Sequence, residues 1–288
     1  MMKLKENLAG FIFLVLALST ISALAIITGF IFLEGVPLIA EVGLIDFLFG
    51  GSWAPGYGEF GIFSMIVGTF AVTLGAAAIG VPFGIICAIF MSEFAPNIMK
   101  KIFRPAIQLL AGIPSVVYGF WGLIVVVPFI SQYIGGLGLS ILAGSIILGL
   151  MMLPTIISIS EVSLMTLPPP YKEGALALGM TQWQAIFSVQ VPAAKSGIVA
   201  AVILGIGRAV GETMAVIMVL GNATALPRSI LDPVRTLTTN IGIEFGYAQD
   251  EHRQALFATG IVLFVVIMIL NITAQYITRE KKKKISKT

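Results

Sequence analysis

Residues 196–220 read SGIVAAVILGIGRAVGETMAVIMVL, an apolar stretch that contains one arginine and one glutamate. A helix needs about 20 apolar residues to cross a bilayer core about 30 Å thick, so this stretch is long enough to span a membrane. The chain of 288 residues is 58% hydrophobic and 11% charged, whereas soluble domains are about 45–50% apolar and about 25% charged. Lipid must therefore cover part of its surface, and the sequence predicts an integral membrane protein.

Five further stretches have the length and composition of membrane spans, at residues 8–33, 64–91, 106–130, 139–160 and 255–278. We therefore predict an all-α membrane protein with six transmembrane helices. The first stretch is longer than the apolar region of a signal peptide, which favours a retained anchor over a cleaved leader. The expected parts are an anchor with an outer loop at 1–63, a membrane core at 64–278 and a basic tail at 279–288.

The basic residues lie mostly in alternate loops. Thirteen of the 17 Lys and Arg precede the first span, follow the sixth, or lie between spans two and three or four and five. The opposite loops carry only Arg228, Arg235 and Arg253. Because basic loops stay inside the cell, both termini are expected in the cytoplasm of a multi-pass cell-membrane protein.

Two charged residues, Arg208 and Glu212, lie inside the stretch quoted above. At about 1.5 Å per residue, Arg208 is roughly 18 Å from its start, near the middle of the bilayer. Glu212 lies one turn further along, at i+4, so we expect both side chains to share a face of the helix. A lone charge at this depth costs about 2.5–3.5 kcal/mol, so both side chains should face protein or water. Gly207 and Gly211 would let another helix or subunit approach closely.

Two interpretations of this pair stay open. Either Arg208 contacts an anion on a transport path and Glu212 positions it, or the two form a structural ion pair. Ionisable groups inside a membrane are usually functional, and the planar donors of arginine match an oxyanion, which favours the first interpretation. Thr213, Ser115 and Tyr118 could line the same path, although each also suits a packing or inter-helix hydrogen bond.

The loop at 161–195 has a pattern of its own. Three prolines at 168–170 end the preceding helix, because proline lacks an N–H and restricts the residue before it. Residues 172–178 then predict a short helix that ends at Gly179. A second helical piece is expected from the N-cap residue Thr181 to about residue 190, followed by a turn at Pro192. The loop is either a docking element for a partner or an amphipathic linker.

Spaced residues in this loop resemble the EAA loop of binding-protein-dependent ABC importer permeases. With three and then nine residues between the groups, they are Glu173, Gly174, Ala175, Gly179, Val189, Val191 and Pro192. The family pattern is E-A-A, three residues, G, nine residues, I-x-L-P, and the departures are Gly174, Val189 and Val191. The resemblance implies a type I importer permease whose cytoplasmic coupling helix docks into a groove on the ATPase subunit. It implies that Lys172, Glu173, Gly174, Ala175, Gly179 and Pro192 form the docking loop.

Three further segments resemble phosphate ABC permeases of the PstC type: GRAVGETMAV at 207–216, GIPSVVYG at 112–119 and SWAP at 52–55. The resemblance implies import of inorganic phosphate by alternating access, with Arg208 and Glu212 associated with its passage. It also implies a sister permease of the PstA type, an ATP-binding subunit of the PstB type at the coupling helix, and a phosphate-binding protein of the PstS type. The binding protein would deliver phosphate to the outer loops at 34–63 and 222–254.

Other function classes are less well supported. A permease for sulfate or molybdate stays open, because the EAA loop would serve it equally. A proton-coupled secondary transporter would use Glu212 as its proton site, but convincing inverted repeats are not visible in the spans. One cysteine and one histidine argue against a disulfide framework and a Cys/His metal cluster. We therefore expect a non-catalytic subunit without metal, cofactor or nucleic acid, and ATP hydrolysis in a separate partner.

Overall fold

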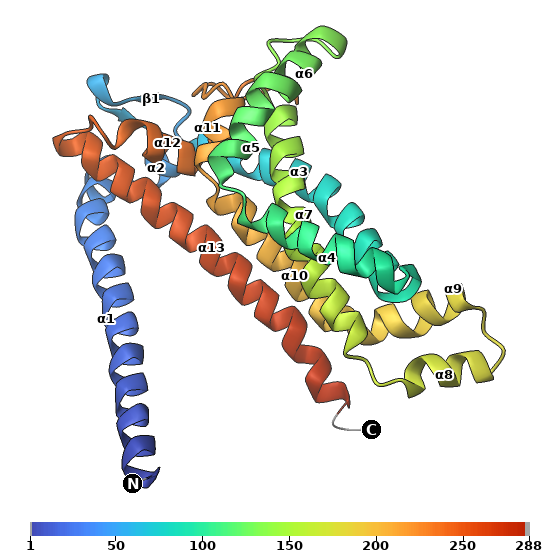
Figure 1. The fold of residues 1–288 in the computed structure, drawn as a ribbon. Helices are drawn as coiled ribbons and strands as arrows, with labels where there is room; N and C mark the ends of the chain where they lie inside the picture. Colours follow the sequence, from blue (N-terminus) through green and yellow to red (C-terminus); the bar gives the residue numbers. More distant parts are fainter. Residues whose placement is uncertain (1, 286–288) are drawn as a thin grey trace.

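The structure, a computed structural model, describes residues 2–285 and is helical apart from one short hairpin (Figure 1). Within this part, six helical stretches are long and apolar enough to cross a membrane: Gly10–Val42, Phe63–Phe94, Ser115–Tyr133, Ile141–Met165, Gln182–Gly211 and Asp250–Thr273. The predicted all-α class and the predicted number of spans, six, are confirmed for the described residues.

The N-terminal part contains α1 (Met2–Val42), α2 (Leu44–Phe49), β1 (Trp53–Ala54), the 3-10 turn η1 (Pro55–Tyr57), β2 (Glu59–Phe60), α3 (Phe63–Ile89) and the π turn η2 (Phe90–Phe94). The middle contains α4 (Asn97–Gly112), α5 (Ser115–Trp121), the π turn η3 (Gly122–Val126), α6 (Val127–Tyr133) and α7 (Ile141–Met165). The C-terminal part contains α8 (Pro170–Ala177), α9 (Gln182–Ala185), the π turn η4 (Ile186–Gln190), α10 (Val191–Gly211), α11 (Met214–Val219), α12 (Leu237–Glu244) and α13 (Asp250–Ile285).

The central bundle is formed by α3, α7 and α10, with α7 the most buried of the six spans. Glycines let α3 approach α7 closely. A β-carbon added at Gly80 would lie 2.9 Å from the carbonyl oxygen of Gly149, and one at Gly84 would lie 2.6 Å from Ile156. Packing of this kind is a main source of attraction between helices in lipid, where no hydrophobic force drives them together.

The Gly80 contact gives a testable stability difference. Gly80→Ala is expected to unfold more easily than Gly29→Ala by about 1–3 kcal/mol, because its methyl group must displace the backbone of α7. Gly29 lies in α1 with open space where its β-carbon would be, so both variants gain the same helix propensity. Thermal unfolding in detergent compares them, and equal midpoints would contradict the packing assignment.

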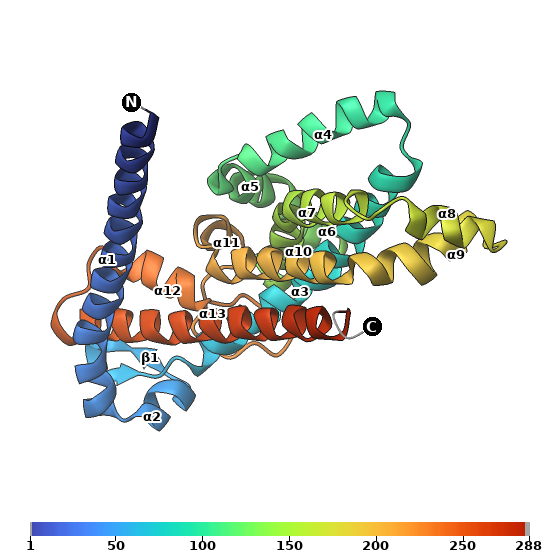
Figure 2. The same cartoon turned by 90° about the horizontal axis from the view of Figure 1, so that it is seen from below.

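Helix α1 is not part of the central bundle. Figures 1 and 2 show that it lies beside α13 near one end, while its N-terminal part is well apart from α3, α7 and α10. The contact with α13 includes an edge-on ring pair, Phe30 with Phe257, and a close approach of Gly35 to the Ala258 backbone. The helix also continues beyond the predicted end at residue 33, through Pro37 to Val42.

The third predicted span, 106–130, is wrong as one continuous helix. Helix α4 ends at Gly112, and Ile113 and Pro114 have extended backbone with ψ of 128° and 138°. The residue before a proline disfavours the helical region, which explains the break. The span that results is Ser115–Tyr133, and residues 97–112 form a separate helix with no buried residue.

The fifth predicted span, 196–220, also differs from the structure. The helix begins earlier, at Gln182, and ends at Gly211. The chain does not turn at Pro192 as expected. Instead, the π turn η4 leads directly into α10, and Pro192 is the second residue of that helix. The wider π turn accommodates a proline that cannot donate to the previous turn.

The molecule has two distinct ends. The hairpin end contains β1, β2, α2, α12 and the loop at 221–236, and the coupling end contains α8, α9, the start of α1 and the end of α13 (Figure 1). Of the predicted tail at 279–288, residues 279–285 continue α13, and 286–288 lie outside the described residues.

Candidate functional site

Arg208 lies in the last turn of α10, on the face that this chain leaves uncovered. The adjacent face of α10 is packed, with Ala209 buried and a β-carbon at Gly205 lying 3.1 Å from Ile156 of α7. Within residues 2–285, Arg208 has no ion pair or hydrogen bond. Gly207 and Gly211 beside it have open space around them. A charge in this position needs water, an anion or another subunit to face it.

The prediction that Glu212 shares a helical face with Arg208 is wrong. The helix ends at Gly211, and Glu212 has extended backbone with φ −71° and ψ 134°. Its side chain turns onto the next helix, where Oε1 accepts a hydrogen bond of 3.2 Å from the N–H of Ala215. Its carbonyl oxygen accepts one of 2.8 Å from the Thr238 hydroxyl. No Arg208–Glu212 ion pair is formed in the described structure, so the structural interpretation of the pair is not supported.

Tyr118 lies on α5, which packs on α11, the helix that follows the break after α10. Helix α5 packs tightly on α11, since a β-carbon at Gly119 would lie 2.8 Å from the Cα of Ala215. Tyr118 is half-buried there, and its hydroxyl donates to the Leu110 carbonyl at 2.9 Å. The structure thus joins α5 to α11, the helix that begins just after Glu212 and Thr213.

Thr213 and Ser115 are placed differently. Thr213 follows Glu212 in the break, with its methyl group against α12, where a β-carbon at Gly242 would lie 2.7 Å away. Ser115 is half-buried one turn before Tyr118, at the first position of α5. Both belong to breaks in helices, one between α4 and α5 and one between α10 and α11. Broken membrane helices are typical of transport sites because their ends expose backbone groups.

The loop at 161–195 forms a distinct unit at the coupling end. Lys172 pairs with the nearly buried carboxylate of Glu93 at the end of the α3 span, and Ala175 is buried. Glu173 and Gly174 point away from the chain and are exposed, with open space at Gly174. One face of α8 therefore anchors the helix, and the other face is free.

The short helix, its end near Gly179 and the cap at Thr181 match the prediction, whereas Pro192 lies within a helix rather than at the expected turn. Helix α8 ends at Ala177, and Gly179 has a positive φ of 84°, a conformation that glycine adopts without strain. Thr181 caps α9 through a reciprocal hydrogen-bond pair with Gln184. Pro192 is exposed in the first turn of α10. Tyr171 and Leu178 are large exposed apolar residues beside the free face, which suits a partner surface.

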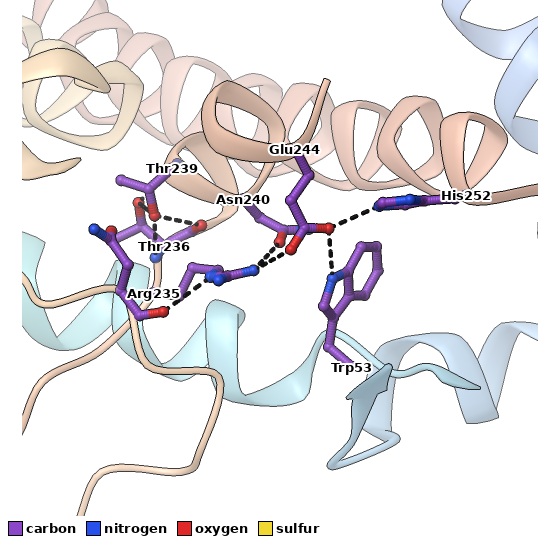
Figure 3. A network of polar contacts seen from close by, with 8 residues as sticks. Trp53, Arg235, Thr236, Thr239, Asn240, Glu244 and His252 are labelled. Atoms are coloured by element: carbon purple, nitrogen blue, oxygen red, sulfur yellow. Dashed lines mark hydrogen bonds and ion pairs between the residues drawn. The ribbon is translucent and has the colours of Figure 1, made fainter. Parts of the chain in front are cut away.

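A third site at the hairpin end was not predicted from the sequence (Figure 3). The Glu244 carboxylate accepts a hydrogen bond of 2.8 Å from the Trp53 indole N–H, lies 2.8 Å from Nε2 of His252 and pairs with Arg235. Its side chain is only 8% exposed. Partial burial and then the Glu244 charge raise the pKa of Tyr247, which Arg235 opposes, so this phenol stays neutral at physiological pH.

Arg235 extends the network. It donates to the Asn240 side chain at 3.0 Å and to the Asn222 carbonyl at 3.1 Å. The network therefore joins the hairpin, the loop after α11, α12 and the start of α13. Its hydrogen-bonded partners are separated by up to 191 residues, and the sequence signal was limited to a tryptophan and an arginine in two different loops. In residues 2–285 no cluster of three or more His, Cys, Asp or Glu is arranged to hold a metal ion.

Comparison with known proteins gives consistent results. The family described as binding-protein-dependent transport system inner membrane component matches residues 80–283. The chain is 44% identical to the probable ABC transporter permease protein YqgH of Bacillus subtilis, over 92% of this chain and 88% of that protein. It is 34% identical to the phosphate transport system permease protein PstC of Haemophilus influenzae, over 91% and 93% of the two chains. It is 36% identical to PstC of Xylella fastidiosa (strain 9a5c), over 80% and 78%.

Solved structures share the fold at lower sequence identity. A chain of a bacterial alginate ABC transporter, crystallised with a pentasaccharide-bound periplasmic protein, aligns with a TM-score of 0.59 at 19% identity, over 92% of this chain and 95% of its own. A chain of the inward-facing MetNI methionine ABC transporter aligns with a TM-score of 0.57, also at 19% identity, over 76% and 93%. The chain thus shares its fold with these two transporter chains.

Proposed function

The chain belongs to the binding-protein-dependent transport inner membrane component family, and from this premise we propose that it is the PstC-type permease subunit of a phosphate importer. Membership makes it a multi-pass membrane subunit of an ABC importer, without catalytic activity of its own. It also implies an ATPase and a binding protein as partners. The substrate, the subunit type and the roles of individual residues are the proposed part.

One observation carries the substrate assignment. Arg208 is a charged residue within a membrane span, next to a break in the helix, and in the part of the chain that the structure describes it has no ion pair or hydrogen bond. Such a charge is costly unless an anion, water or another subunit faces it. An arginine presents several donors in a plane, which suits the oxygens of phosphate. Similarity to PstC proteins over most of the chain supports phosphate as that anion.

The path proposed for phosphate contains Arg208, Tyr118, Thr213, Ser115 and the Glu212 segment. Phosphate meets the uncovered face of α10, and a sister permease of the PstA type closes the path from the other side. Open space at Gly207 and Gly211 supports a close approach of that subunit. Glu212 acts by holding the break between α10 and α11 rather than by neutralising Arg208.

The other partners occupy the two ends. A PstB-type ATPase docks on the exposed face of α8, whose docking residues are Lys172, Glu173, Gly174, Ala175, Gly179 and Pro192. A PstS-type binding protein docks at the hairpin end. Both termini share the coupling end with α8 (Figure 1), which supports an orientation with termini and docking loop in the cytoplasm.

Substrate competition tests the proposed function. The complete transporter, reconstituted in proteoliposomes with the sister permease, ATPase and binding protein, is expected to take up labelled phosphate at a rate that excess sulfate or molybdate leaves unchanged. A site built for one oxyanion discriminates because a wrong ligand leaves buried donors unpaired. Uptake of sulfate or molybdate in place of phosphate would overturn the substrate while leaving the ABC importer assignment intact.

A further inference from the structure

Helix α12 lies between the hairpin and the break in span five. Its N-terminal end is fixed to the bundle, where the N–H of Leu237 donates to the hydroxyl of Thr69 in α3 at 3.0 Å. Thr236 and Thr239 cap this end reciprocally, and both are buried, as are Leu237 and Thr69. The position of α12 relative to α3 is therefore set by specific hydrogen bonds rather than by loose apolar contact.

Two contacts join α12 to the break itself. The Thr238 hydroxyl donates to the carbonyl oxygen of Glu212 at 2.8 Å. This hydrogen bond satisfies a carbonyl group at the end of α10 that has no acceptor role within that helix. One turn later Gly242 faces Thr213, and only a hydrogen atom fits between the backbone and the Thr213 methyl group. A shift of α12 along or toward α10 would therefore move residues 212–213.

The other end of α12 is joined to the hairpin through Glu244. A carboxylate in the last turn of a helix is opposed by the helix dipole, so Glu244 needs donors to be stable there. The Trp53 indole, Arg235 and His252 supply them from three different segments (Figure 3). Trp53 also packs edge-on against Phe60, its partner across the hairpin, so the hairpin and Glu244 move together.

Taken together, these contacts make α12 a rigid connection about 12 Å long, at about 1.5 Å per residue over eight residues. We propose that Thr238, Gly242 and Glu244 are positioning residues that transmit engagement of the hairpin to the Glu212–Thr213 break, and through it to Arg208. This inference rests on the proposed function in one respect, namely that the binding protein docks at the hairpin end. The proposed coupling links docking of the binding protein at the hairpin end to the positions of Glu212, Thr213 and Arg208.

A double-mutant cycle tests the contact between α12 and the break. Gly242→Ala adds a methyl group that meets Cγ2 of Thr213, and Thr213→Ser removes that same Cγ2 while keeping the hydroxyl. In the reconstituted transporter, Gly242→Ala is expected to lower labelled phosphate uptake at least about fivefold in the Thr213 background. In the Thr213→Ser background its effect is expected to fall below about twofold. An equal loss in both backgrounds would overturn the proposed contact.

A second pair of variants separates positioning from folding. Thr238→Val keeps the shape but loses the donor to Glu212, whereas Thr238→Ser keeps the donor. The readout is the ratio of ATP hydrolysis with binding protein to hydrolysis without it, which does not depend on the transported substrate. Thr238→Val is expected to lower this ratio at least about fivefold and Thr238→Ser to preserve it. A purely structural role would lower both rates equally, leave the ratio unchanged and overturn the proposal.

These readouts fail separately from the proposed function. If wild type takes up no phosphate but its ATP hydrolysis still responds to the binding protein, the substrate is wrong and the ratio still tests α12. If wild type transports phosphate and both the cycle and the ratio are unaffected, the α12 proposal is wrong and the function stands. Glu244→Gln, which keeps an acceptor for Trp53 but loses the charge facing Arg235, is expected to lower the ratio as Thr238→Val does.

Discussion

Replacing Arg208 with glutamine is expected to lower ATP-driven phosphate uptake by about thirtyfold or more in the reconstituted transporter. The guanidinium is the charged donor on the uncovered face of α10, and losing one partner of a desolvated charge pair typically costs about 2–5 kcal/mol. Each 1.36 kcal/mol corresponds to about tenfold in rate. The measurement is the initial rate of labelled phosphate uptake at saturating ATP.

Two controls define this result. Lys101→Gln removes an exposed cation from α4, and we expect uptake within about twofold of wild type because isolated surface charges contribute little. Arg208→Lys keeps the charge but loses the planar fork, so an intermediate rate is expected. If Arg208→Gln transports phosphate as well as Lys101→Gln does, Arg208 is not on the path.

Reversing the charge at Glu173 is expected to disconnect ATP hydrolysis from transport. Glu173 is exposed on the free face of α8, while Lys172 and Ala175 hold the other face to the chain. Like charges placed together in an interface cost several kcal/mol, so Glu173→Lys should lower uptake at least about tenfold and weaken co-purification of the ATPase. The permease itself should unfold at the wild-type temperature, because in residues 2–285 this carboxylate has no ion pair to lose.

Lys101→Glu is the matched charge reversal for this experiment, at an exposed position on α4. It is expected to retain both ATPase binding and uptake. Normal co-purification and uptake for Glu173→Lys would contradict the docking assignment of α8, whatever the substrate.

Much of the architecture could be predicted because it depends on local composition. Long apolar stretches determine the six spans, and the proline run, Gly179 and Thr181 determine the limits of α8 and the start of α9. The break before Ser115 was predictable in principle from the Ile113-Pro114 pair, since a residue before proline resists the helical conformation. Treating 106–130 as continuous gave hydropathy more weight than this backbone restriction.

The break at Glu212 and the Glu244 network could not be predicted in this way. Glu212 leaves the helix where Thr238, 26 residues later, supplies the hydrogen bond to its carbonyl. Glu244 depends on Trp53, which lies 191 residues earlier in the chain. Partners at such separations leave no periodic or spacing signal in one sequence. The rule that residues four apart share a helical face applies only where the helix continues, and here it ends at Gly211.

The most direct test of the central claim is the energy source of phosphate uptake. Proteoliposomes containing this chain and its sister permease are compared with and without the ATPase and binding protein, with ATP present and with an imposed proton gradient. The account predicts uptake only when ATP, ATPase and binding protein are all present, with no response to the gradient. Uptake that persists without the ATPase and follows the gradient would contradict it, and would indicate proton coupling at Glu212.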